Sequence, residues 1–255
     1  MKNKRLKFLS MTLILIFIFV LYISFLYVDI FHLKSRISSD ILKYISILLC
    51  VLLSMLSGSD ALSSKDLSLL HFGMIMTAIA DLCLLILDFF TVGVVVFCIV
   101  QITYCIRYLP NSVHNTVKNF MINFVAVIFI FFILGIFIKN LDILLIVALF
   151  YATCLTTSVY RAVSACINKL FPSPNRYFIA FGMILFLLCD INVALFNIAS
   201  YINPAYTIGS LADISCTLIW LFYLPSQVLI ALSGYDMNKL FSNSINPKSK
   251  EALKG

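Results

Sequence analysis

The hydrophobic pattern of the chain consists of long apolar runs separated by short polar segments. The run from Leu9 to Val28 contains no charged residue and does not alternate between apolar and polar positions. A helix needs about 20 apolar residues to cross a bilayer, whereas the strands of a membrane barrel alternate over about 10 residues. The pattern therefore predicts membrane-spanning helices. On this rule we expect spans at residues 7–30, 41–58, 67–88, 91–108, 117–138, 141–164, 177–198 and 212–233.

The composition excludes other classes of protein. The chain is 62% hydrophobic and 11% charged, with a mean hydropathy of +1.07, whereas a soluble domain carries about 25% charged residues. Disordered chains are poor in the apolar residues that dominate here. We therefore expect an all-α, polytopic membrane bundle of eight transmembrane helices. It forms one integral membrane domain over residues 1–255, in which residues 241–255 are a polar cytoplasmic tail.

The basic residues predict the orientation of the chain. Fourteen of the 18 Lys and Arg residues lie in the N-terminal segment, the C-terminal tail and the loops on the same side of the membrane. The positive-inside rule then predicts that both termini are cytoplasmic, in a multi-pass protein of the plasma membrane. Because the basic residues are scattered over these loops, no nucleic-acid partner is expected. The first apolar run is too long for a cleaved signal peptide, so we interpret it as an uncleaved anchor.

The eight cysteines lie in or beside apolar runs, without a Cys-x-x-Cys pair and without a His at metal-ligand spacing. Such cysteines are typically buried free thiols that pack as small apolar residues. We expect neither a metal site nor another cofactor.

Two aspartates lie well inside expected spans, whereas the other acidic residues, Asp66 among them, lie at expected helix ends or in loops and are expected to be solvated or interfacial. An ionisable residue at the depth of Asp81 or Asp190 costs at least about 2.5 kcal/mol on insertion scales and therefore indicates a functional site. The structural alternative is a carboxyl group that only hydrogen-bonds to a neighbouring helix.

The surroundings of the two aspartates match. Gly73-Met74-Ile75 precedes Asp81 by eight residues, and Gly182-Met183-Ile184 precedes Asp190 by eight. Asp88 and Asn197 each follow by seven residues, which would place them on the same helical face as the aspartates. At 1.5 Å per residue, both aspartates are expected about 10–12 Å from the outer end. These matches predict two four-helix parallel repeats, with halves at 1–110 and 111–240.

Other polar residues inside the spans are expected to line the same cavity. Thr77 lies one helical turn before Asp81, Gln101 and Tyr104 are three residues apart, and Tyr223 and Gln227 are four apart, so each pair shares a helix face. Hydroxyl and amide groups also connect membrane helices without any further role, and this alternative applies to each of them. The weaker candidates are Asn123, Tyr151, Thr156, Tyr160, Asn192 and Ser226.

Two segments resemble the YhhN-like lysoplasmalogenase family. One runs from Phe72 to Tyr104 and contains Ala80-Asp81-Leu82 and Gln101-Ile102-Thr103-Tyr104; the other contains Leu187-Leu188-Cys189-Asp190, followed by Tyr223 and Gln227-Val228-Leu229. The resemblance implies an eight-span fold and places the aspartates of the family at Asp81 and Asp190. The resemblance also associates a His with the position of Gln101. Because glutamine does not transfer protons as histidine does, we expect this position to contribute hydrogen bonds only.

The activity that the resemblance implies is hydrolysis of the vinyl ether bond of a lysoplasmalogen, a lysophospholipid within the bilayer. The products are a fatty aldehyde and a glycerophospho-base. Cleavage begins with protonation of the β-carbon, so it needs one neutral carboxylic acid and one carboxylate that stabilises the cation or activates water. Asp81 and Asp190 are the expected catalytic pair, with Thr77, Gln101, Tyr104, Tyr223 and Gln227 as substrate-binding residues. The sequence leaves open which aspartate is the acid.

Two other classes remain open from the residues alone. A proton- or cation-coupled membrane transporter would also use intramembrane aspartates, but Pro does not interrupt the helices expected to carry Asp81 and Asp190. An intramembrane aspartyl protease would also use two Asp residues, but its Gly-x-Gly-Asp and Tyr-Asp motifs are absent.

Overall fold

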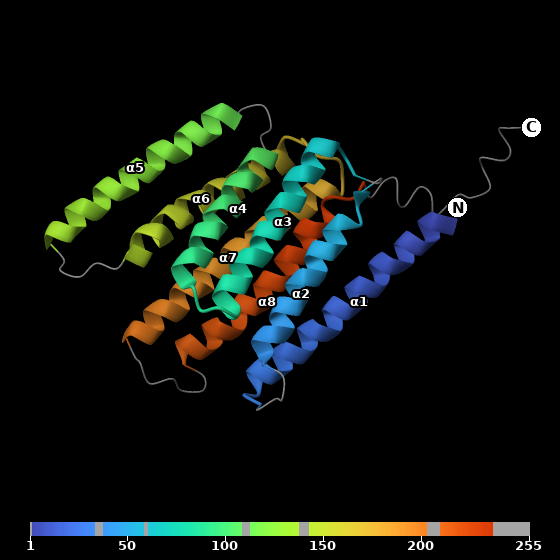
Figure 1. The fold of residues 1–255 in the computed structure, drawn as a ribbon, viewed down its shortest axis with the longest axis horizontal. Coiled ribbons are helices and arrows are strands. Elements are labelled where there is room, and N and C mark those ends of the chain that lie inside the picture. Colours follow the sequence, from blue (N-terminus) through green and yellow to red (C-terminus); the bar gives the residue numbers. More distant parts are fainter. Residues whose placement is uncertain are drawn as a thin grey trace, which may run out of the picture.

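The computed structural model describes residues 2–33, 38–58, 61–108, 113–137, 143–202 and 210–236. Within these residues the chain forms eight α-helices, which confirms the expected all-helical class (Figure 1). The helices are α1 (Lys2–Ile30), α2 (Ser39–Met55), α3 (Ser64–Leu85), α4 (Phe90–Tyr108), α5 (Val113–Phe137), α6 (Ile143–Ile167), α7 (Asn175–Ile202) and α8 (Leu211–Leu232).

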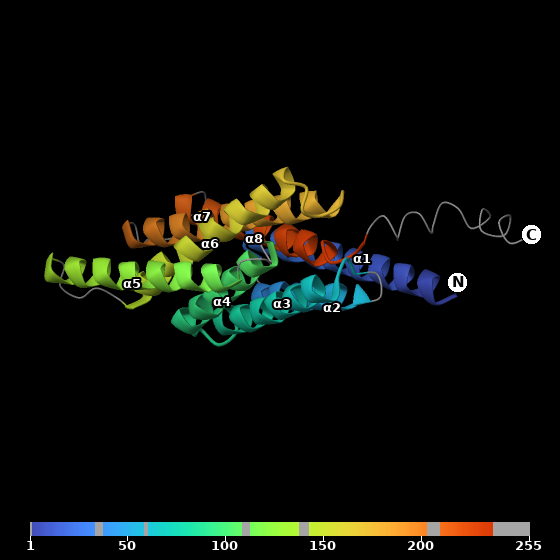
Figure 2. The same cartoon turned by 90° about the horizontal axis from the view of Figure 1, so that it is seen from above.

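Six helices form a closed ring. Seen from above, α2, α3 and α4 form one layer and α6, α7 and α8 the other, with α1 and α5 at opposite edges (Figure 2). Neighbouring helices pack within each layer, and the layers join where α4 packs on α6 and where α8 packs on α2. Outside the ring, α1 contacts α2 and α8, and α5 contacts α4 and α6. The first residues of α3 and α7 and the last residues of α4 and α8 lie at the same end of the bundle. We call this the inner end.

Six helices in the described residues are long and apolar enough to cross a membrane: α1, α3, α4, α6, α7 and α8. The protein is therefore a multi-pass helical membrane bundle. The helix α2 has 17 residues, and α5 contributes a shorter apolar stretch, Phe120–Ile130. The count of eight spans stays a prediction.

The third helix ends earlier than expected. It stops at Leu85, and Asp88 has a φ of 55° in the short connection to α4. Because α4 already starts at Phe90, the chain must reverse within a few residues, and Asp tolerates the left-handed conformation better than most residues. The prediction that Asp88 shares a helix face with Asp81 is therefore wrong.

A proline inside α8 is compensated by a neighbouring helix. Pro225 has no N–H to donate to the carbonyl of Leu221 four residues earlier, and the hydroxyl of Tyr22 on α1 donates to this carbonyl at 2.9 Å. Neighbouring helices can satisfy such freed groups in a membrane. The bundle thus accommodates Pro225 inside α8.

The two matched glycines allow close helix packing. A Cβ on Gly73 would lie 2.5 Å from a ring carbon of Tyr104 on α4, and one on Gly182 would lie 3.0 Å from Ile230 on α8. Small residues at membrane helix interfaces let neighbouring helices approach closely. Each glycine therefore brings the helix that carries an aspartate close to the helix that follows it.

Candidate active site

Asp81 lies in the interior of the ring. It is 17 residues from the start of α3, and its side chain is 3% exposed. The hydroxyl of Tyr223 on α8 donates a hydrogen bond of 2.7 Å to Oδ2 of Asp81. The contact joins the two layers of the bundle.

Asp190 lies at a similar depth, 15 residues from the start of α7, and is half-buried. The hydroxyl of Tyr151 on α6 donates to Oδ2 of Asp190 at 2.6 Å. The structure thus gives each of the two acids a tyrosine hydroxyl as hydrogen-bond donor.

The two tyrosines pack on one aromatic ring. Phe97 on α4 lies 6.1 Å from the ring centre of Tyr151 and 6.5 Å from that of Tyr223. Phe186 on α7 lies 5.9 Å from Phe97 and 5.5 Å from Tyr223. The contacts with Tyr223 and the Phe97–Phe186 contact are edge-to-face, whereas Phe97 and Tyr151 are tilted by 49°; aromatic pairs prefer such arrangements to a face-to-face stack. The acids and their donors come from α3, α6, α7 and α8, and Phe97 holds the donors in place.

The two glutamines expected at the site are both fully buried. Ser158 on α6 donates to Oε1 of Gln101 at 2.6 Å, whereas Nε2 of Gln101 has no hydrogen-bond partner in the described part of the chain. Neither amide atom of Gln227 has one there either. A buried polar atom without a partner costs about 1–3 kcal/mol. Gln227 lies one turn from Tyr223 on the same face of α8, so its unused amide is next to the Asp81 side of the site.

Two other expected residues make different contacts. The hydroxyl of Thr77 donates to the backbone carbonyl of Gly73 within its own helix, at 2.9 Å. The hydroxyl of Tyr104 contacts the sulfur of Met74 at 3.5 Å, about two turns from Asp81 toward the inner end. Of the five expected binding residues, Tyr223 contacts an aspartate directly, and Thr77 and Tyr104 do not.

Tyr151 contributes more than expected. A single tyrosine in an apolar span forms no pattern, so the sequence marks Tyr151 only as a weaker candidate. In the structure its hydroxyl donates to Asp190, as the hydroxyl of Tyr223 donates to Asp81. Finding Tyr151 requires knowing that α6 packs on α7, the helix that carries Asp190.

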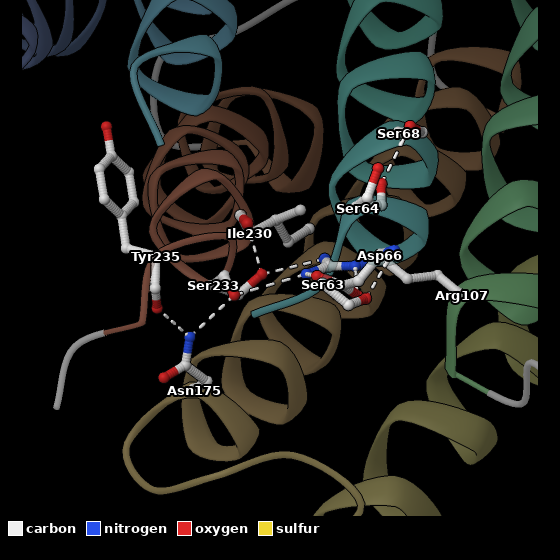
Figure 3. Close-up of polar contacts among 9 residues, drawn as sticks. All are labelled: Ser63, Ser64, Asp66, Ser68, Arg107, Asn175, Ile230, Ser233 and Tyr235. Carbon is white, nitrogen blue, oxygen red and sulfur yellow. Dashed lines mark hydrogen bonds and ion pairs between the residues drawn. The ribbon is translucent and has the colours of Figure 1, made fainter. Parts of the chain in front are cut away.

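A second buried polar cluster lies at the inner end (Figure 3). The guanidinium of Arg107 on α4 donates through Nε and Nη2 to the two carboxylate oxygens of Asp66 on α3, at 2.7 and 3.1 Å. It also donates to Oγ of Ser233 at 3.0 Å. Asn175 at the start of α7 donates to the backbone carbonyls of Ser233 and Tyr235. Asp66 is 9% exposed and Arg107 2%. The expectation that Asp66 is solvated or interfacial is wrong, because antiparallel packing of α3 and α4 places Arg107 against it.

Among the described residues, no group of three or more His, Cys, Asp or Glu side chains could hold a metal ion. The eight cysteines are free, and six of them are buried, as their apolar surroundings predicted. The polar side chains described above at this site offer carboxyl, hydroxyl and amide groups.

Comparison with known proteins gives a family and no individual relative. No curated protein and no solved structure matches the chain. A model of the YhhN family matches residues 38–234, a range that runs from the residue before α2 to the residues just after α8 and includes both aspartates. The match covers well over half of the 255 residues. The chain belongs to the YhhN family.

Proposed function

We propose that the protein is a membrane hydrolase that cleaves the vinyl ether bond of lysoplasmalogens, with Asp81 and Asp190 as the acid–base pair. The observation that carries the proposal is a pair of intramembrane carboxyl groups, each bonded to a tyrosine hydroxyl whose ring packs on Phe97. Within the described part of the chain, neither carboxyl forms an ion pair with a basic side chain. Two carboxyl groups that share a water-poor site readily hold one proton between them, and acid-initiated ether cleavage needs such a pair.

The proposed reaction follows the electron demand of a vinyl ether. One aspartic acid gives its proton to the β-carbon, and the ether oxygen then shares the positive charge of an oxocarbenium ion. Water adds to the cationic carbon and loses a proton to the carboxylate, which restores the acid. The hemiacetal collapses to a fatty aldehyde and the glycerol hydroxyl. Paired-carboxylate glycosidases pass through a similar cation.

The exposure of the two carboxyls favours different roles for them. Asp190 is half-buried, whereas Asp81 is 3% exposed. Asp190 is therefore the carboxyl placed to meet a lipid that arrives from the bilayer, and Asp81 supports it from within the ring. The free amide atoms of Gln227 and Gln101 provide the next polar contacts for the glycerol part of the substrate; Thr77 and Tyr104 line the path further toward the inner end.

We further infer that the chain is one membrane domain of two parallel repeats, with both termini cytoplasmic in the plasma membrane. The order of the ring is compatible with this arrangement. When α1–α4 are matched in order with α5–α8, every pair of neighbouring ring helices corresponds to another neighbouring pair. The edge helix α1 then corresponds to the other edge helix, α5. Cysteine-accessibility labelling after Lys239 checks the orientation, and labelling from outside the cell would contradict it.

The purified protein in detergent or nanodiscs tests the activity. We expect aldehyde release from a lysoplasmalogen and none from the matched lysolipid with a saturated ether, which cannot form the cation by carbon protonation. The rate should fall as the pH rises, because the acid must carry its proton, and should fall in deuterium oxide if carbon protonation limits the rate. Folded protein that releases no aldehyde would contradict the proposal and favour proton- or cation-coupled transport.

A further inference from the structure

A cavity of about 230 Å³ lies between α5 and α6, outside the helix ring. Its lining residues are Phe120, Ile122 and Asn123 from α5 and Thr157 and Arg161 from α6. It thus combines one guanidinium, one amide and one hydroxyl group with two apolar side chains. Neither aspartate of the candidate active site nor its tyrosine donor lines it.

The polar groups of this cavity lie at different distances from the inner end along the helix axes. Arg161 is six residues from the inner end of α6, or about 9 Å, and Thr157 is ten residues, or about 15 Å. Asn123, ten residues from the start of α5, matches the depth of Thr157. Beyond them, Phe124 and Phe150 pack edge to face at 4.8 Å. Among the polar lining groups the charge is nearest the inner end and the neutral groups follow, which is the order of headgroup and glycerol in a lipid. The two apolar lining residues, Phe120 and Ile122, lie seven and nine residues from the start of α5, beside these polar groups.

The positive charge is held in place and reinforced. Nη1 of Arg161 donates to the backbone carbonyl of Cys105 on α4 at 3.1 Å, which orients the guanidinium. Lys118 is exposed on α5, one turn toward the inner end from Ile122 and on the same helix face. A guanidinium with a nearby ammonium matches a phosphate group. Basic pockets between membrane helices bind lipid headgroups on the same physical basis.

We propose that this cavity binds an anionic phospholipid, with its phosphate on Arg161 and its glycerol region against Asn123 and Thr157. The bound lipid is a separate molecule from the substrate. Arg161 and Tyr151 are ten residues apart on α6, about 15 Å along the axis, and Tyr151 bonds to Asp190. Three glycerol carbons separate the phosphate and the ether oxygen of a lysophospholipid, which is too short to join the two places.

Native mass spectrometry of the full chain in detergent, titrated with phosphatidylglycerol, tests the proposal without any activity readout. We expect one lipid to bind, and Arg161→Gln to weaken its binding about tenfold or more, since a charge-assisted contact is lost. Lys65→Gln is the matched control: it likewise removes one positive charge near the inner end, here the exposed ammonium of Lys65 on α3, and should bind as the parent does.

Two lipid arms and a second variant complete the experiment. Phosphatidylcholine should bind several-fold more weakly than phosphatidylglycerol, and millimolar inorganic phosphate should not displace the lipid. Asn123→Trp fills the cavity from α5 without removing Arg161 and should also abolish the bound lipid. Equal binding by Arg161→Gln and Lys65→Gln, retained binding by Asn123→Trp, or displacement by inorganic phosphate would each overturn the assignment. Asn123→Trp decides the question if Arg161→Gln does not fold.

Discussion

Asp66 and Asp81 lie fifteen residues apart on the same helix, and both are almost inaccessible, but they face opposite kinds of partner. Asp66 faces a guanidinium that contacts both of its oxygens, and that guanidinium also bonds to Ser233. Asp81 instead accepts from the neutral hydroxyl of Tyr223. One helix therefore carries a compensated charge at its inner end and, near its outer end, an acid whose hydrogen-bond donor is neutral.

The comparison separates a structural acid from a chemical one. A buried carboxylate with a bidentate arginine is balanced, and its role is to hold α3, α4 and the end of α8 together. Two carboxyls inside one bundle, with tyrosine hydroxyls as their donors, gain little for stability, since a water-poor surrounding disfavours the charged form of each. Groups held at such a cost indicate a functional site.

The largest expected effect is on activity at the middle of the bundle. Asp81→Asn and Asp190→Asn keep the shape and hydrogen bonding of the side chain but remove the acid. We expect each to lower the aldehyde release rate by about 10²–10⁴-fold, with the double variant no worse, since the groups act as a unit. Thermal unfolding should be unchanged or shifted upward, because a neutral amide is easier to hold in a membrane.

Asp88→Asn is the matched control, because Asp88 lies in the connection after α3 and is exposed. It should keep nearly the parent rate. A well-folded Asp81→Asn protein that turns over at the parent rate would contradict the paired-acid mechanism.

The inner end should show the reverse behaviour. Removing one partner of a buried ion pair leaves the other uncompensated, so Arg107→Gln or Asp66→Asn should destabilise the protein by about 3–5 kcal/mol. Combining both substitutions should recover part of this loss, because neither charge is then stranded. Unfolding in detergent followed by circular dichroism checks the prediction. Equal stability of Arg107→Gln and Asp81→Asn would remove the distinction between the two regions.

Much of the bundle could be predicted from sequence because a bilayer requires a long apolar run in each spanning helix. The starts and ends of the apolar runs predict the bounds of the eight helices in the described residues to within a few positions. The position of Asp81 and Asp190 well inside such runs singles out these two acids. The pairing of Asp66 with Arg107 could not be read from burial patterns, since both lie at helix ends where solvated charge is normal. Tyr151 required the packing of α6 on α7, and the early end of α3 required the tight reversal at Asp88.

A smaller effect is expected from the donors to the two acids. Tyr223→Phe and Tyr151→Phe each remove one hydrogen bond to a carboxyl but keep the aromatic packing on Phe97. We expect roughly a tenfold loss of rate for each, in line with the contribution of a hydrogen bond to a charged group. Tyr108→Phe is the control, since its buried hydroxyl has no hydrogen-bond partner in the described part of the chain. A rate loss for Tyr108→Phe as large as that for Tyr223→Phe would show that the loss does not come from the hydrogen bond to the carboxyl.

The smallest expected effect distinguishes the two buried glutamines. Gln227→Met keeps the shape of the side chain and removes two amide atoms that have no partner in the described residues, so the free protein should gain about 1 kcal/mol of stability. Gln101→Met should gain less, because it also removes the acceptor of Ser158, whose hydroxyl still donates to the carbonyl of Leu155.

If the free amide of Gln227 binds the glycerol part of the substrate, Gln227→Met should raise KM several-fold while kcat changes little, since a contact made equally in the ground and transition states affects binding alone. Steady-state kinetics and thermal unfolding on the same preparations measure both effects. A stabilised Gln227→Met protein with an unchanged KM would remove Gln227 from the binding site and leave the two acids and their tyrosines as its polar groups.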